Sequence, residues 1–294
     1  MSHSSEPDNE GQHKTISFDE ALATALPILQ GMKKNLRGAP KATRSSLDQL
    51  ISTRPNLPDS FAKTDRPSPL TKYIGKTPEP TTLPMDVGRL AKLEELKAKI
   101  LSCTRCPNLV ASRTHVVYGV GNPFAELLFV GEAPGEEEDQ KGEPFIGKAG
   151  QLLTKIISAM EYTREDIFIA NILKCRPDMP AGESGNRKPK PAEMATCLPW
   201  LTQQIDLLKP KVIVALGLTA VEGLLGEPRT MRDVRGKWLD YHGVPLMPTY
   251  HPAYLLRNQT LAEKRKVWED MLLVLEKLGR PISVKQRGYF LEKS

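Results

Sequence analysis

Short apolar runs alternate with amphipathic stretches along the chain from about residue 86 onward. Four runs have the length and β-branched content of strands that are covered on both faces, at 126–131, 167–173, 211–216 and 244–249. Helical spacing of apolar residues marks the segments 87–101, 149–160, 191–208, 219–225 and 261–278. This rhythm predicts an α/β fold, a three-layer α/β/α sandwich around a central, mainly parallel four-stranded sheet.

The first 85 residues have a different composition. They are rich in Pro, Ser, Thr and Lys, so they bury too little apolar surface to offset the entropy of ordering them. We therefore expect a largely disordered extension at 1–85, one domain of ordinary size at 86–280 that would carry the activity, and a tail at 281–294. Within the extension, 16–36 has helical spacing that Pro27 interrupts. It is either a short helix that binds an unidentified protein or a stretch without function.

The charge balance favours an anionic partner. The net charge is +6 and the pI about 9.0, although solubility alone also explains a charge of this size. No run approaches the roughly 18 apolar residues that cross a bilayer, and the acidic N-terminus lacks a signal-peptide pattern. We expect a monomer in the cytoplasm, in the bacterial cytosol or nucleoid, with no membrane partner.

The stretch from Gly131 to Gly150 has the composition of a ligand site. It follows an apolar run directly and contains a carboxylate at the strand end, Glu132, several glycines, and Phe145 between Pro144 and Gly147. In open α/β folds, ligands bind at the carboxyl edge of the sheet. We therefore expect this stretch to line a cleft at that edge.

Four cysteines indicate a metal site without identifying the metal. They are Cys103, Cys106, Cys175 and Cys197, the first two in a Cys-x-x-Cys. A redox pair would be expected at a strand-to-helix junction, whereas this pair follows a helix. Zinc and an iron–sulfur cluster both accept four thiolates, and four free core cysteines are the structural alternative.

Two further polar residues follow predicted strands. His251 lies in the segment TYHPAYLLR, where it could donate a hydrogen bond to developing negative charge, or simply begin a helix. Asn171 lies at the end of the run at 167–173, where its amide could read a planar ligand edge or cap the strand. The apolar residues after His251, followed by Arg257, suit insertion into a base stack or packing inward.

Four motifs in this order resemble the family 4 uracil-DNA glycosylases, the iron–sulfur branch of that superfamily. The segments are Gly131–Gly135 (GEAPG), Gly142–Gly147 (GEPFIG), Asn171–Pro177 (NILKCRP) and His251–Arg257 (HPAYLLR). The resemblance extends over about residues 90–278. It implies a three-layer α/β/α fold, excision of uracil from single- or double-stranded DNA, and a [4Fe-4S] cluster on Cys103, Cys106, Cys175 and Cys197, with zinc as the alternative.

The resemblance also assigns roles to residues of the pocket. Phe145 would stack on a flipped uracil, Asn171 would read its N3–H and O4, and His251 would donate to O2 as negative charge develops there. The backbone around Gly131, Ala133 and Gly135 would approach the base.

The motif departs from the better-known family 1 pattern at two positions. Ala133 and Gly135 stand where family 1 enzymes have a water-activating Asp and a Tyr that blocks thymine. We therefore expect Glu132 to position water or stabilise the sugar cation, and Glu138 to close the pocket near C5. Either acid could instead cap a turn.

The DNA backbone would contact cations around this pocket. The candidates are Lys148, Lys174, Arg176 and Arg257, and Leu255 would be the wedge that enters the base stack. An insertion at 178–188 lengthens the spacing between Cys175 and Cys197 and could alter DNA contacts. The competing hypothesis is a non-catalytic nucleic-acid-binding module of the same fold, and a third is an enzyme for another damaged base.

Overall fold

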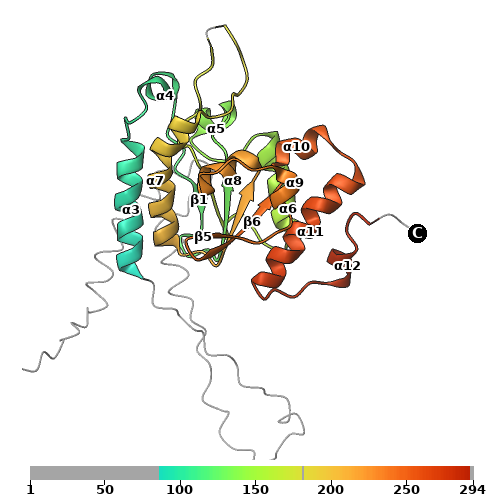
Figure 1. Ribbon diagram of the computed structural model, residues 1–294. Coiled ribbons are helices and arrows are strands. Elements are labelled where there is room, and N and C mark those ends of the chain that lie inside the picture. The colour runs from blue at the N-terminus through green and yellow to red at the C-terminus, as the bar shows by residue number, and fades with distance from the viewer. Residues whose placement is uncertain (1–85, 181, 292–294) are drawn as a thin grey trace, which may run out of the picture. The chain divides into compact units, whose positions relative to one another are not determined.

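The computed structural model describes residues 86–180 and 182–291. The predicted helix at 16–36 and the rest of the extension lie outside these residues. Within the described part, one six-stranded sheet has the strand order β1-β3-β2-β4-β6-β5 (Figure 1). Its strands are β1 (Val120–Gly121), β2 (Leu127–Gly131), β3 (Phe168–Asn171), β4 (Val212–Leu216), β5 (Leu239–Tyr241) and β6 (Val244–Thr249).

The four predicted strands form the parallel centre of the sheet. β3, β2, β4 and β6 pair in parallel, whereas β1 and β5 pair antiparallel at the two edges. The sheet thus has two strands more than the four expected. These edge strands are two and three residues long, too short to stand out as apolar runs.

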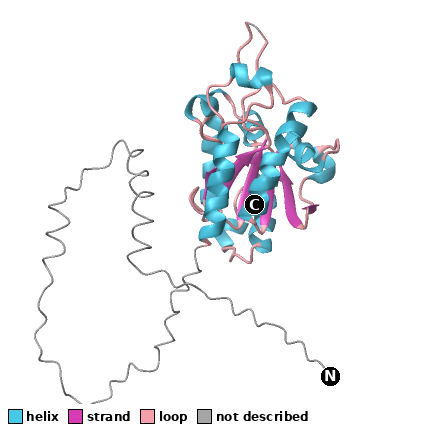
Figure 2. Ribbon diagram, turned by 90° about the vertical axis from the view of Figure 1, so that its left-hand side faces the viewer, coloured by secondary structure: helices cyan, strands magenta, loops and turns pink. Residues whose placement is uncertain are grey.

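Helices cover both faces of the sheet, as the alternation of segments predicts (Figure 2). The helices are α3 (Val87–Leu101), α4 (Pro107–Ser112), α5 (Glu136–Lys141), α6 (Lys148–Ala159), α7 (Pro191–Leu208), α8 (Leu218–Leu225), α9 (Met231–Val234), α10 (Pro252–Arg257), α11 (Leu261–Lys277) and α12 (Val284–Arg287). Across residues 86–180 and 182–291, no helix combines the length and the apolar character needed to cross a membrane.

Alternate residues of each central strand pack into two separate cores. In β2, Leu128 and Val130 join a core with α3, α7 and α8, while Leu127 and Phe129 join a second core with α6 and α11. All five residues of β2 are buried, as are all five of β4. Burial on both faces explains why these strands read as continuous apolar runs.

The carboxyl ends of the parallel strands meet at one edge of the sheet. Gly131 at the end of β2 pairs with Asn171 at the end of β3, and Leu216 of β4 pairs with Thr249 of β6. The chain passes from β2 to β3 on one side and later places β4 on the other side of β2. Such a switch in strand order is where open α/β sheets bind ligands.

The C-terminal segment packs against the domain as far as it is described. The Trp268 indole N–H in α11 donates to the carbonyl of Gln286 at 2.6 Å, and the Gln286 amide donates to the carbonyl of Ala159 at 3.0 Å. Gln286 is buried in α12. Residues 281–291, which the sequence sets apart as a tail, therefore contact both α11 and the end of α6.

A buried carboxylate joins α11 to the end of β6. Asp270 is fully buried, and it accepts a hydrogen bond from the Thr249 hydroxyl at 2.7 Å and from the Arg235 guanidinium at 2.9 Å. Arg235 also donates to the carbonyl of Lys266 at 2.8 Å. This network fixes Thr249 two residues before His251.

We expect Asp270→Ala to destabilise the fold by about 3 kcal/mol, because it leaves a partly buried guanidinium and a buried hydroxyl without their partner. Urea unfolding measures the change in free energy. The matched control is Glu269→Ala, since Glu269 pairs with Arg265 at the surface and such pairs contribute less than about 1 kcal/mol. Equal effects of the two substitutions would contradict the role of the network.

Candidate active site and cysteine centre

Gly131 is the point at which the strand ends and the pocket residues meet. A Cβ at this position would lie 2.4 Å from both the Asn171 Oδ1 and the Phe145 Cζ. Only glycine leaves room for the ring and the amide to approach the end of β2 this closely. The loop at 131–150 therefore lies against the carboxyl edge of the sheet, and the cleft expected there stays a prediction.

The loop that carries Phe145 is held from two sides. Phe145 is buried and has a φ of 54°, a left-handed conformation that is unfavourable for an aromatic residue. The Arg164 guanidinium donates to the carbonyls of Pro144 at 2.8 Å and Phe145 at 3.1 Å. From the other side, the Glu138 carboxylate accepts from the backbone N–H groups of Ile146 and Gly147, each at 3.0 Å.

These contacts change the interpretation of Glu138. Its Oε1 is engaged with two backbone N–H groups of the Phe145 loop, so the carboxylate holds the turn. This matches the capping alternative and gives Glu138 a structural task in place of the expected closure of the pocket.

Asn171 presents an unpaired acceptor inside the protein. Its side chain is 2% exposed, and its Oδ1 is buried without a hydrogen-bond partner. Leaving a buried polar group unsatisfied costs on the order of 1–3 kcal/mol. Such an atom beside Gly131 and Phe145 is suited to accept a hydrogen bond from a bound ligand.

His251 is neutral, and its tautomer follows from one contact. Burial, together with the nearby Arg257 and against an opposing effect of Glu138, lowers the pKa of its imidazole to about 4. The backbone N–H of Ala253 donates to its Nδ1 at 3.1 Å, so Nδ1 is the acceptor and Nε2 carries the proton. The ring lies 5.6 Å from the Phe145 ring, centroid to centroid. His251 thus both begins α10 and offers an N–H donor.

The acidic motif after β2 lies at the same edge. Glu132 is half-buried, and burial raises the pKa of its carboxyl, whereas the Thr219 hydroxyl and Lys188 lower it. Ala133 packs against the core, and Gly135 lies under Glu138. A Cβ at Gly135 would lie 2.7 Å from Glu138 Oε2 and 3.2 Å from Asn186 Nδ2.

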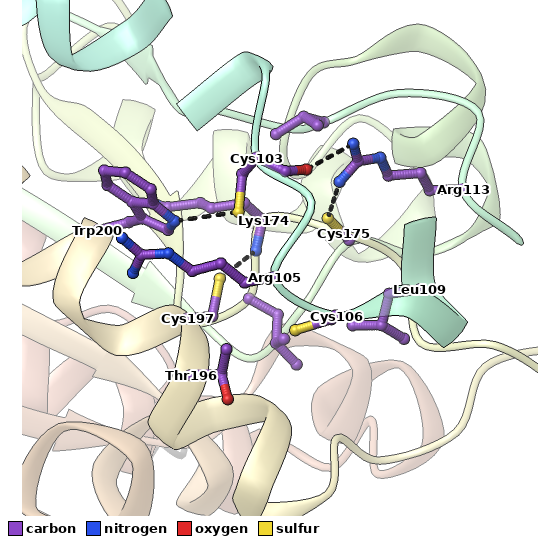
Figure 3. Close-up of a pocket in the computed structure, with 12 residues that line it drawn as sticks. Cys103, Arg105, Cys106, Leu109, Arg113, Lys174, Cys175, Thr196, Cys197 and Trp200 are labelled. Carbon is purple, nitrogen blue, oxygen red and sulfur yellow. Dashed lines mark hydrogen bonds between the residues drawn. The ribbon is translucent and has the colours of Figure 1, made fainter. Parts of the chain in front are cut away.

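The four cysteines line a single cavity, as Figure 3 shows. Cys103 and Cys106 flank the start of α4, Cys175 follows β3, and Cys197 lies on α7. Among residues 86–180 and 182–291, no group of three or more His, Cys, Asp or Glu is arranged to hold a metal ion. Burial raises the pKa of the Cys197 thiol to about 11, so its thiolate requires a cationic partner.

Hydrogen-bond donors point at three of these four sulfurs (Figure 3). The Trp200 indole donates to Cys103 Sγ at 3.3 Å, the Arg113 guanidinium to Cys175 Sγ at 3.1 Å, and the backbone N–H of Lys174 to Cys197 Sγ at 3.3 Å. Arg113 also donates to the Cys103 carbonyl at 2.8 Å. It therefore ties the Cys-x-x-Cys segment to the segment after β3.

The expected DNA-contacting residues differ in their accessibility. Lys148 at the start of α6 and Arg257 at the end of α10 are exposed. The Arg176 guanidinium donates to the carbonyl of Gly185 at 2.7 Å and lies 3.7 Å from Glu136, so it is already engaged. Lys174 is 2% exposed, and the expectation that it contacts phosphates is wrong because its side chain points into the cysteine centre.

The expected wedge requires a similar correction. Leu255 is 4% exposed, because the buried face of α10 also includes Pro252. Leu256 is 37% exposed, so in this conformation it is the leucine of α10 that is accessible to DNA.

Several residues of the site escape sequence reasoning because they lie in loops without periodicity. Asn186 reaches Gly135 from the insertion at 178–188, and Arg187 clamps the base of that loop to Asp178 and Glu193. Lys188 pairs with Glu222 of α8 at 3.0 Å. The loop projects from the carboxyl edge of the sheet (Figure 1). The one sequence signal for these residues was the expectation that the insertion at 178–188 could alter DNA contacts.

Comparisons with known proteins agree with this geometry. A sequence model described as Uracil DNA glycosylase superfamily matches residues 118–272. A type-4 uracil-DNA glycosylase of Thermotoga maritima is 44% identical over 61% of this chain and 91% of its own length. The type-4 enzyme of Sulfurisphaera tokodaii is 42% identical over 68% of this chain and 90% of its own. A type-5 enzyme of Pyrobaculum aerophilum is 27% identical over 56% of this chain.

The fold, with its switch in strand order beside β2, is that of the uracil-DNA glycosylase superfamily. Within that superfamily, the chain belongs to the type-4 enzymes. The resemblance that the four sequence motifs carry is thereby confirmed.

The pKa of His251 supplies a test of the pocket. We expect its imidazole to titrate near 4 and to remain neutral from pH 5.5 to pH 8, because protonation would place a charge in a buried site beside Arg257. Arg257→Gln should raise this pKa. A folded pKa below the ordinary value also means that the stability contributed by neutral His251 is lost as pH falls from about 6.5 toward 4.

NMR titration of the His251 ring signals measures both effects. The ring signals of the exposed His242 serve as the internal reference in the same spectra. A His251 that titrates near 6.5 in the unmodified protein would contradict its burial as a neutral donor.

Proposed function

We propose that this chain removes uracil from DNA by flipping the nucleotide out of the stack and hydrolysing its N-glycosidic bond. The reaction leaves an abasic site and begins base excision repair. The observation that carries the proposal is the buried, unpaired Asn171 Oδ1, which lies beside Gly131 together with the Phe145 ring, while the neutral His251 ring lies next to Phe145. A planar base with an N–H at its edge satisfies that acceptor.

Recognition of uracil follows from the hydrogen-bonding pattern of its edge. The Asn171 Oδ1 accepts from the uracil N3–H, and the side-chain amide donates to O4. Cytosine presents an acceptor at N3, which would leave Oδ1 unpaired at a cost on the order of 1–3 kcal/mol. The Phe145 ring forms the floor, and stacking on a base contributes on the order of 1–3 kcal/mol.

Bond cleavage requires stabilisation of the departing uracil anion. We assign this role to the His251 Nε2–H, which donates to uracil O2. The ring is neutral before the reaction, and the Ala253 N–H fixes its Nδ1 as an acceptor. The Nε2–H donor is therefore already in place when the base binds. Loss of a preorganised donor of this kind typically lowers kcat by about 10²–10³-fold.

The attacking water is assigned to the side of the pocket that carries Glu132. Its carboxyl is half-buried between Thr219 and Lys188, where it can orient water or stabilise the sugar cation. The capping alternative for Glu132 remains open. Ala133 and Gly135 in the neighbouring motif positions carry no carboxylate, and Glu132, unlike Glu138, is not engaged in holding the Phe145 loop.

The DNA strand would be bound around the mouth of the pocket. Lys148 and Arg257 are exposed cations for phosphate contacts, and α10 supplies the apolar side chain that fills the space left by the flipped base. We expect the enzyme to act as a monomer in the cytoplasm on single- or double-stranded DNA. These finer points, and a protein partner for residues 1–85, stay predictions.

We further propose that the four cysteines hold a [4Fe-4S] cluster. Support comes from the single cavity that they line and from the N–H donors aimed at three of their sulfurs, since metal-bound thiolates are stabilised by such contacts. A four-iron cluster binds each thiolate through a different iron, so its ligands need not converge on one point as zinc ligands do. The cluster would order the loops around β3, and base excision itself needs no electron transfer.

The excision assay tests the proposed function. A labelled oligonucleotide with one uracil should become cleavable by alkali after incubation with the protein. We expect Asn171→Ala to lower the rate by about tenfold to hundredfold and His251→Ala by about 10²–10³-fold, while both variants still bind DNA.

The control for the histidine is the exposed His242, whose left-handed backbone tolerates His242→Asn, and this variant should keep the full rate. Absence of alkali-labile product from both single- and double-stranded substrates would favour the non-catalytic nucleic-acid-binding module instead.

The cluster has its own test. The protein purified without oxygen should show a broad absorbance near about 400 nm from iron–sulfur charge transfer, which zinc lacks. Cys197→Ser should lose this band together with bound iron, because Cys197 is a buried ligand on α7. A colourless protein with one equivalent of zinc would refute the cluster and leave the excision proposal intact.

A further inference from the structure

Lys174 is a buried lysine that the excision chemistry does not use. Its side chain is 2% exposed, and it lines the cysteine cavity together with Arg113 and Trp200 (Figure 3). A buried ammonium is costly unless it is paired and hydrogen-bonded. A charged lysine at this position therefore needs hydrogen-bonding or ionic partners that offset the free-energy cost of burying its ammonium.

One partner of the Lys174 ammonium is the main chain of the base-reading residue. Its Nζ donates to the carbonyl oxygen of Asn171 at 3.1 Å. Within residues 86–180 and 182–291, no carboxylate lies within ion-pair distance of this ammonium. Lys174 also lines the cavity of the four cysteines, and its backbone N–H contacts Cys197 Sγ, so the same residue contacts both Asn171 and the cysteine centre.

The backbone of Lys174 is also fixed on both sides. Its N–H donates to Cys197 Sγ at 3.3 Å, and its carbonyl accepts from the N–H of Val117 at 2.7 Å. The residues between Asn171 and Lys174 continue along the motif loop, where the N–H groups of Ile172 and Leu173 donate to the carbonyls of Gly131 and Glu132 at 2.9 and 3.1 Å. Asn171 and Lys174 are thus the two ends of one short, hydrogen-bonded segment of chain.

We propose that Lys174 is a positioning residue that couples the cysteine centre to the uracil pocket. The anionic thiolates of the loaded centre hold its ammonium in place, and the ammonium holds the Asn171 carbonyl, so that the Asn171 amide faces the base. This inference rests on the proposed function and on the proposed cluster, and it gives the cluster a task in base recognition without electron transfer.

The test compares Lys174→Met with Lys155→Met, in both cases with the intact chain carrying its cluster. Met has a straight apolar chain that fills the same space without charge or donor. Lys155 is an exposed lysine on α6 and serves as the matched control. The two readouts are the affinity for free uracil, measured by calorimetry, and the reduction potential of the cluster, measured by voltammetry.

In Lys174→Met we expect uracil affinity to fall on the order of tenfold, because the Asn171 carbonyl loses a charged donor. The reduction potential should become more negative, because removal of a cation beside the cluster disfavours the added electron. Lys155→Met should match the unmodified protein in both. A shifted potential with unchanged uracil affinity would make Lys174 a counter-ion only and overturn the coupling, as would the absence of both changes.

Lys174→Gln separates the effect of the charge from that of the hydrogen bond. It is also the variant to measure if Lys174→Met does not retain the cluster. It keeps an N–H donor without a charge, so the potential should shift while part of the uracil affinity returns. Equal uracil affinity in Lys174→Gln and the unmodified protein, with an unshifted potential, would overturn the proposal. The unmodified protein and Asn171→Ala test the proposed function separately, since free uracil should bind the first and not the second.

Discussion

The absence of a side chain at Gly131 is the constraint on which the pocket depends. The parallel register sets Gly131 beside Asn171, and the space that a Cβ would occupy is taken by the Asn171 amide and the Phe145 ring. The strained backbone of Phe145 is tolerated because Arg164 and Glu138 hold the loop from opposite sides. The residues of the candidate site are thereby held in place by backbone and loop contacts, and such preorganisation lowers the cost of binding a ligand.

The pocket and the cysteine centre are parts of one structure because both grow from the end of β3. Asn171 ends the strand, and Cys175 follows four residues later; between them, Lys174 donates hydrogen bonds to the Asn171 carbonyl and to Cys197 Sγ on α7. Arg113 connects the same segment to the Cys-x-x-Cys loop. The cysteine segments and Asn171 are therefore held by one connected set of hydrogen bonds.

The central strands and the main helices could be predicted because burial alone determines their apolar patterns. These patterns are a continuous run in a strand covered on both faces and a stripe of helical spacing in a helix. Apolar runs such as 126–131 are continuous since both faces of β2 are covered, and the helix at 87–101 has an apolar stripe that packs on the sheet. The edge strands β1 and β5 were not predicted, because two or three residues are too few to show an alternation of apolar and polar positions. The orientation of Leu255, the burial of Lys174 and the role of Glu138 depend on how loops fold back in three dimensions, which composition and spacing do not encode.

The clamp at the base of the 178–188 loop has a consequence for how this region can change. Arg187 binds both Asp178 at one end of the loop and Glu193 in the first turn of α7, and Asn108 donates to both carboxylates. Because its two ends are joined in this way, the number of residues in the loop does not set the spatial distance between Cys175 and Cys197. Residues can be added or removed between the clamped ends without moving the cysteines. This part of the chain can therefore change in length and sequence while the segments beneath it keep their places.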